Sequence, residues 1–114
     1  MNTGSAIREA KKGTAELFVL ALLEDEAKHG YELARLIDER SRGELTFNFA
    51  SLYATLYKLE ERGLIRGRWV ERAGQRRRRC YWITDQGRRA LEAQRKEWRR
   101  FFGLVRDLAG LSHA

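Results

Sequence analysis

Residues 48–84, NFASLYATLYKLEERGLIRGRWVERAGQRRRRCYWIT, join a helical pattern to two strand patterns. Leu52, Leu56 and Leu59 recur at spacings of four and three, which predicts a helix over about 49–62 with one face toward a core. A glycine directly after this helix suits its C-terminal end. A helix followed at once by a pair of strands is the feature that decides the fold class.

The two strands are predicted over 64–72 and 77–84, where aromatic and β-branched residues have high strand propensity. Gly74 lies between them and suits a hairpin turn. Alternation along the second strand places Tyr81 and Ile83 on one face, and Cys80 and Trp82 on the other. The hairpin therefore carries a run of four arginines, residues 76–79, at its tip.

Helical patterns cover the chain on either side of this stretch. We expect a first helix over 14–24, capped by Thr14, a second over 30–41, and a last helix over 85–110 with apolar residues at heptad spacing. This order predicts a mainly α fold with a small β-hairpin, a winged helix-turn-helix plus a C-terminal dimerisation helix. The expected parts are a basic N-terminal arm over 1–12, a winged helix-turn-helix DNA-binding domain over 13–84, and the dimerisation helix over 85–114.

The overall charge points to the class of partner. The chain has 114 residues, and its 23 Lys and Arg against 16 Asp and Glu give a formal net charge of +7. Such a balance favours nucleic acid first and an anionic membrane second. The apolar run at 17–23 is far shorter than the roughly 20 residues that span a bilayer, so we expect no membrane partner. A single cysteine excludes an internal disulfide and is compatible with a cytoplasmic location.

The sequence contains no recognised pattern of catalytic or metal-binding residues. We find no Ser/His/Asp or Cys/His arrangement and no Gly-rich phosphate loop, so we predict that the chain is not an enzyme and needs no cofactor. His29, His113 and Cys80 lack metal-ligand spacing, so no metal site is expected. A redox role for Cys80 stays open, because nearby arginines favour a thiolate.

Candidate DNA contacts come from the second helix, the third helix and the hairpin. Hydrogen-bonding side chains on the outer face of a recognition helix meet base edges and phosphates, and arginines at the tip of a wing meet phosphates or a minor groove. The predicted DNA-binding residues are Tyr31, Ser51, Tyr53, Thr55, Lys58, Arg76, Arg77, Arg78 and Arg79.

Four segments together resemble PadR-type transcriptional regulators of the kind with a single C-terminal helix. They are HGYEL at 29–33, SLYATLYKLEERGLI at 51–65, RRCYWITDQG at 78–87, and EW at 97–98. The resemblance covers about residues 13–110. It implies a homodimeric winged-helix repressor that binds a pseudo-palindromic operator in double-stranded DNA, with the last helix packing near the partner's first helix.

The resemblance also implies an effector. Some members of this family bind flat aromatic compounds between the subunits, stacked on a tryptophan pair. Trp98 matches that tryptophan and Leu17 matches an apolar residue of the pore, while a bulky Phe102 one turn on would fill the pore. The residues expected to bind an effector or to form the dimer interface are Leu17, Trp98, Phe101, Phe102 and Val105.

Two functions are therefore compared. The first is a sequence-specific DNA-binding transcriptional regulator, a homodimeric repressor relieved by a small planar aromatic molecule. The alternative is a winged-helix module that binds protein or RNA without regulating a promoter, and it predicts binding without steep sequence preference. The pattern is compatible both with an open pocket at Trp98 and with a filled dimer core there. It is also compatible both with repression and with activation of transcription.

Overall fold

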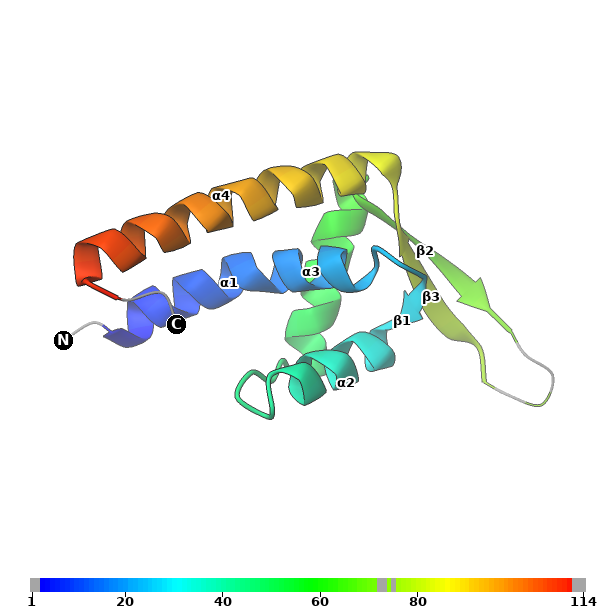
Figure 1. Cartoon of the computed structure of the whole chain (residues 1–114). Coiled ribbons are helices and arrows are strands. Elements are labelled where there is room, and N and C mark those ends of the chain that lie inside the picture. The colour runs from blue at the N-terminus through cyan, green and yellow to red at the C-terminus, as the bar shows by residue number, and fades with distance from the viewer. Residues whose placement is uncertain (1–2, 72–73, 75, 112–114) are drawn as a thin grey trace.

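The described residues of the chain form four helices and three short strands. Residues 3–71, 74 and 76–111 are described by the computed structural model, with side chains described from residue 13 onward. The elements are α1 (Thr3–Leu22), β1 (Lys28–His29), α2 (Gly30–Arg40), α3 (Phe49–Glu61), β2 (Ile65–Val70), β3 (Arg78–Ile83) and α4 (Asp85–Ala109). In Figure 1, α1 lies between α4 and α2, and α3 crosses behind them. The hairpin of β2 and β3, here called the wing, projects at the end opposite the C-terminus of α4.

The winged helix-turn-helix fold is confirmed, and the ends of α3 and α4 follow from their caps. Asn48 Oδ1 accepts a hydrogen bond from the Ser51 N–H at 2.7 Å, which satisfies a free amide in the first turn of α3. Thr84 Oγ1 does the same for the Gly87 N–H at 3.0 Å in α4. Gly110 ends α4 with a φ of 70°, a conformation in which glycine has no steric penalty.

The sheet has three strands in the order β1-β3-β2, rather than the two of the predicted hairpin. The added strand, β1, lies between the first two helices, where no strand was predicted, and pairs Lys28 with Tyr81 and His29 with Cys80. Lys28 is buried, and its Nζ donates to the Leu22 carbonyl at 2.6 Å and to Asp25 Oδ1 at 3.0 Å. Lys28 thus links the end of α1 to β1, which pairs with β3 on the side opposite β2.

The first helix also differs from the prediction. It begins at Thr3, so the prediction that Thr14 caps it is wrong. Residues 3–12 of the expected arm are rich in Ala, Arg, Lys and Glu, which have high helix propensity, and the helix simply continues through them. Residues 1 and 2 of the arm, and the side chains of 3–12, lie outside the described residues.

One apolar core holds the domain together. Leu52, Leu56 and Leu59 of α3 are buried as predicted, and they pack with buried residues of α1, α2, the wing and the start of α4. Tyr81 and Ile83 point into this core, whereas Cys80 and Trp82 are only half-buried on the other face of β3, again as predicted. The core therefore fixes α3 and the base of the wing relative to each other.

The first half of α4 belongs to the same core. Leu91 is fully buried, and Arg95 forms two hydrogen bonds with the Glu24 carboxylate, at 2.8 and 3.0 Å. Gly87 lies so close to the Leu64 carbonyl that a Cβ there would stand 2.0 Å from its oxygen, which explains a glycine in the first turn. Among the described residues, no helix is long and apolar enough to cross a membrane.

Candidate nucleic-acid interface

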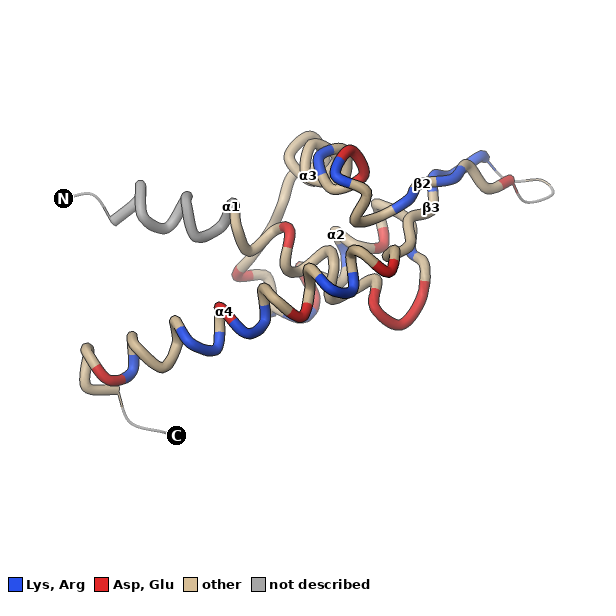
Figure 2. The backbone as a smooth tube through the Cα atoms, turned by 90° about the horizontal axis from the view of Figure 1, so that it is seen from above, with Lys and Arg blue, Asp and Glu red and all other residues tan. Residues whose placement is uncertain are grey.

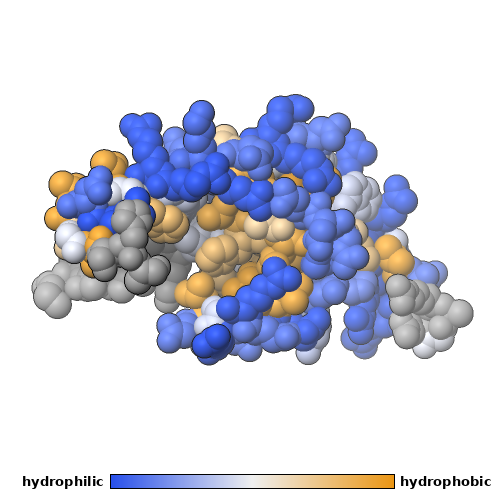
Figure 3. Space-filling view, viewed as in Figure 1, coloured by the Kyte–Doolittle hydropathy of each residue, from blue (hydrophilic) through white to orange (hydrophobic). Residues whose placement is uncertain are grey.

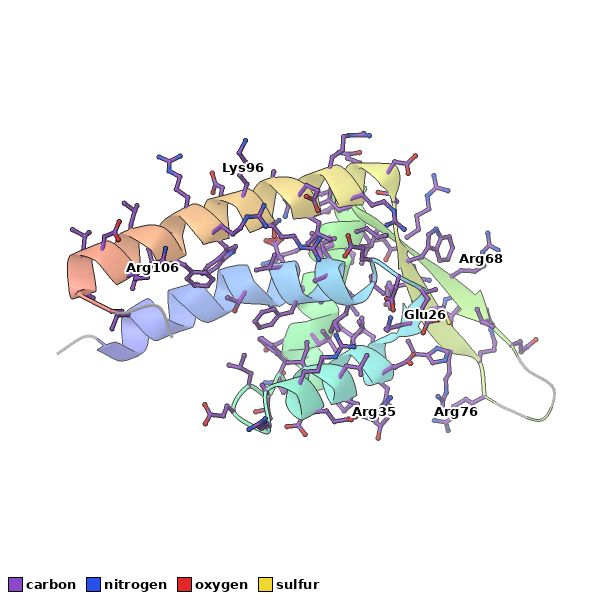
Figure 4. All side chains as sticks on the ribbon, in the orientation of Figure 1. Glu26, Arg35, Arg68, Arg76, Lys96 and Arg106 are labelled. Carbon is purple, nitrogen blue, oxygen red and sulfur yellow. The ribbon has the colours of Figure 1, made fainter. Side chains whose placement is uncertain are left out.

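One hollow lies where the wing faces the beginnings of α2 and α3. It has a volume of about 550 Å³. Its lining residues are His29, Gly30, Tyr31, Tyr53, Trp69, Arg76, Arg77, Arg78, Arg79 and Tyr81. In Figure 4, Arg76 of the wing and Arg35 of α2 lie along the same edge of the molecule. Six of the nine predicted DNA-binding residues thus come together here, from parts of the chain that are far apart in sequence.

A row of aromatic rings joins α2 to α3 beside this hollow. The ring of Tyr31 stacks on Phe49 with centroids 6.0 Å apart and planes at 17°, and Phe49 lies 6.5 Å from Tyr53. Tyr53 packs directly over Gly30, where a Cβ would stand only 2.6 Å from the tyrosine oxygen. All three rings are still about half exposed. One side of the row therefore packs against the protein, and the other side is accessible to a partner.

The outer face of α3 carries the other predicted contacts. Ser51 and Lys58 are exposed, whereas Thr55 is half-buried and donates its hydroxyl hydrogen to the Ser51 carbonyl at 3.1 Å. These three residues do not line the hollow; they lie along the outer face of α3. The predicted DNA-binding residues therefore form two groups in the structure: those that line the hollow beside the wing, and those on the polar outer face of α3.

The four arginines of the wing differ in their surroundings. Arg76, Arg77 and Arg78 are exposed, and the Arg77 guanidinium lies 5.3 Å from the centre of the Trp69 ring. Arg79 is half-buried and its Nη2 lies 2.6 Å from Glu60 Oε2 at the end of α3. Three of the cations are available to a polyanion, and the fourth is paired within the chain.

The charge pattern matches this division. Figure 2 shows Lys and Arg following the two wing strands, and a second basic stretch along α4. On the wing, Arg68 also lies over Trp82, 5.2 Å from the ring centre, so aromatic rings support arginines on both faces. Burial raises the pKa of the Tyr81 hydroxyl above its ordinary value of 10.0.

His29 and Cys80, far apart in sequence, are brought together by β1 and β3. The His29 Nδ1 and Cys80 Sγ atoms are 3.1 Å apart. Across the described ranges, no three potential ligands among His, Cys, Asp and Glu gather into a group that could hold a metal.

The residues predicted for the dimer interface or effector site fall mainly on the second half of α4. Trp98 lies 6.0 Å from Phe101 and 5.6 Å from Phe102 between ring centres, so the three aromatic rings form one cluster. Phe101 and Phe102 are each more than half exposed, and Val105 is half-buried. Leu17 packs instead at the margin of the core on α1. In Figure 3, hydrophobic surface occupies the middle of the view between polar upper and lower edges, and further hydrophobic surface lies at the left, near the C-terminal end of α4.

Sequence reasoning missed Phe49, Trp69 and Glu60. Phe49 begins the predicted third helix, and in the structure it is also the middle ring of the aromatic row. Trp69 has high strand propensity, and in the structure its ring also supports Arg77 and Arg79. The exposed aromatic at the start of α3 was a detectable signal, whereas the partner of Glu60 depends on how the wing folds back.

Comparison with known proteins agrees with this geometry. A family model described as the transcriptional regulator PadR-like family matches residues 19–93. A PadR family transcriptional regulator from Eggerthella lenta is similar in structure, with a TM-score of 0.80 and 26% identity, covering 96% of this chain and 93% of that one. A Lysinibacillus sphaericus protein without an assigned function is 28% identical over 87 residues, which are 76% of this chain and 80% of that protein.

A third relative was solved with DNA. The structure of Bacillus subtilis PadR in complex with operator DNA has a TM-score of 0.63 and 23% identity, covering 69% of this chain and 45% of that chain. At this identity the likeness concerns the fold alone.

Proposed function

Because the chain belongs to the PadR-like family of transcriptional regulators, we propose that it binds a specific operator in double-stranded DNA as a homodimer and represses transcription there. The observation that carries the proposal is the hollow in which the wing arginines face Tyr31 and Tyr53 from the helix-turn-helix. The operator complex of Bacillus subtilis PadR supports the same use of this fold. Its DNA partner would place the protein in the cytoplasm.

The recognition helix is α3. Its N-terminal half, which carries the exposed Ser51, enters the major groove, and Lys58 is exposed in the last turn of the same helix. Both side chains have hydrogen-bonding groups for base edges and phosphates. Thr55 lies on the same face, one turn after Ser51, and its hydroxyl is directed to the helix backbone. Tyr31 and Tyr53 border the groove and offer hydroxyls to the phosphates.

The wing follows the neighbouring backbone. Arg76, Arg77 and Arg78 are exposed guanidinium groups on a projecting hairpin, and guanidinium charge that neutralises phosphates releases condensed counterions. This term is independent of sequence, so the wing supplies affinity while α3 supplies specificity.

The homodimer forms through the second half of α4. Phe101, Phe102 and Leu108 are 53%, 57% and 86% exposed, a concentration of apolar surface that a water-facing helix does not sustain alone. Pairing this face with α1 of a second copy buries it and places two recognition helices about 34 Å apart, the distance of one DNA turn.

The effector is a planar aromatic molecule that binds beside Trp98 and the neighbouring phenylalanines. Such a molecule relieves repression only when it binds one spacing of the two DNA-binding heads better than the other. The tilted and edge-on rings of the cluster offer apolar faces for stacking.

A selection of genomic fragments with the purified protein, repeated at two salt concentrations, tests this function. We expect one inverted-repeat sequence to be recovered at both concentrations. Recovery of arbitrary fragments, with binding that collapses at the higher concentration, would contradict the proposal. It would favour the winged-helix module that binds protein or RNA.

A further inference from the structure

The end of α3 is joined to both strands of the wing through one carboxylate. Glu60 Oε2 accepts a hydrogen bond from Arg79 Nη2 on β3 at 2.6 Å and from the Gly67 N–H on β2 at 3.3 Å. The side chains of Glu60 and Arg79 are 30% and 28% exposed, so the pair is partly shielded from water. Glu60, Gly67 and Arg79 are here called the clamp.

Gly67 makes room for this contact. A Cβ at this position would lie 2.7 Å from Arg79 Nε and 2.8 Å from its Cζ and Nη2. The guanidinium therefore crosses β2 over the glycine. Gly67 is not among the residues with positive φ, so its backbone suits alanine and only the space is restricted.

Two aromatic rings complete the surroundings of Arg79. Its guanidinium carbon lies 5.7 Å from the ring centres of both Trp69 and Tyr81. The group is thus held by a carboxylate and two rings, whereas the preceding three arginines are exposed. A cation held in this way has its charge compensated before any DNA arrives.

We propose that Glu60 and Arg79 are positioning residues, which hold the wing at a fixed angle to the recognition helix, and that Arg79 does not contact a phosphate. This inference rests on the proposed DNA-binding function. Binding needs α3 in the groove and the wing on the backbone at the same time. A wing fixed beforehand lowers the entropy cost of binding, so the clamp increases affinity without touching DNA.

For removal of the Glu60 charge, the proposal predicts a change in DNA affinity opposite in sign to the change that simple electrostatics predicts. Loss of a carboxylate near a phosphate backbone would by itself strengthen binding. Removal of the Glu60 charge should instead weaken binding, because the wing loses its anchor. The neighbouring Glu61 is exposed on the same helix and forms no ion pair within the described part of the chain, so it provides the matched control.

The experiment measures fluorescence anisotropy with the operator recovered by selection and with a random duplex, at several salt concentrations. Glu60→Gln and Gly67→Ala should each weaken operator binding about three- to tenfold, as for a partly exposed ion pair, with the slope of log affinity against log salt unchanged. Gly67→Ala retains both charges, so it tests position alone. Glu61→Gln should bind as well as the wild type or more tightly.

Arg79→Gln and Arg78→Gln separate positioning from phosphate contact. Loss of one phosphate contact reduces the salt slope by about 0.9, which we expect for Arg78→Gln and not for Arg79→Gln. The Glu60→Gln/Arg79→Gln double variant should bind no more weakly than either single variant, because the two side chains act as one unit. Thermal unfolding of each variant confirms that it is folded.

Two results would overturn the inference. If Arg79→Gln reduces the salt slope as Arg78→Gln does, Arg79 is a phosphate contact. If Glu60→Gln and Gly67→Ala bind like the wild type, the clamp does not position the wing. In both cases the wild-type protein still binds its operator, and the proposed function stands. If the wild type prefers no sequence, the proposed function itself fails, and the clamp has no role in operator binding.

Discussion

The wing and the second half of α4 both project from the core and both expose side chains, but they do so in different ways. The wing exposes arginines, which are well solvated, and it is tied to α3 through Glu60. The distal part of α4 exposes Phe101, Phe102 and Leu108, which are poorly solvated. A charged surface is stable in water until its partner arrives, whereas an apolar surface of this size favours a permanent partner. Under the proposed function, we therefore expect transient binding at the wing and constant binding at α4.

The largest expected effect is on dimer formation through the apolar second half of α4. Phe101→Glu places a charge in the surface that we propose to be buried in the dimer, once from each subunit. The dimer dissociation constant should rise by about hundredfold or more, as at the centre of a protein interface. Sedimentation equilibrium measures it.

Arg100→Glu, the neighbouring exposed residue, is the control, because it reverses a charge without touching the aromatic cluster. It should leave the dimer intact. A Phe101→Glu protein that remains dimeric at the same concentrations would show that α4 does not form the interface.

The next effect tests the charged side. Replacing Arg76, Arg77 and Arg78 together with alanine should weaken binding to all DNA sequences and reduce the salt slope by about 2.7, since each phosphate contact contributes about 0.9. The matched control replaces Arg88, Arg89 and Arg99, three exposed arginines of α4, and has the same net charge. Equal slopes for the two triple variants would mean that net charge alone attracts the DNA.

A smaller and more selective effect is expected on α3. Lys58→Ala should weaken operator binding by about 1–3 kcal/mol if the side chain contacts a base edge. Random duplex should be affected less, so the ratio of the two affinities falls. Competition titrations measure that ratio, and a ratio equal to that of the wild type would place Lys58 outside the base contacts.

The smallest expected effect concerns the first half of α4, which packs against the core of the same chain. The hydrogen bond from Arg95 keeps the pKa of Glu24 below its ordinary value of 4.5. A lowered pKa stabilises the folded state above pH 4.5, and this contribution is lost as the pH falls through the lower, folded-state pKa. Glu24→Gln should therefore reduce stability slightly at pH 7, and the reduction should become smaller at pH 3, below the ordinary pKa of 4.5.

Urea unfolding at the two pH values measures this difference, with the exposed Glu97→Gln as the control. Because the Glu24 carboxylate is largely solvated, we expect a small change that decreases as salt is added. A loss of stability that is equal at both pH values would show that the ion pair is not its cause.

Much of the architecture was predictable from residue patterns. The leucine spacing in α3 located a buried helix, and the order of helices and hairpin identified the winged helix. The start of α1 and the strand β1 were not predictable in the same way. Thr14 has a side chain that suits a helix cap, but the helix-favouring residues before it extend α1 to Thr3. The strand β1 depends on pairing with β3, which is far away in the sequence.

The sequence by itself determined which residues are charged, apolar or hydrogen-bonding, and where helical and strand periods begin. These properties depend on local spacing, so they identified an arginine-rich wing beside a polar helix and an aromatic seam at the C-terminus. Only the tertiary structure decided that Arg79 is paired with Glu60 while its three neighbours are exposed, and that Tyr53 rests on Gly30. The physical reason is that these contacts join segments brought together by the core, and their distances are properties of the packing.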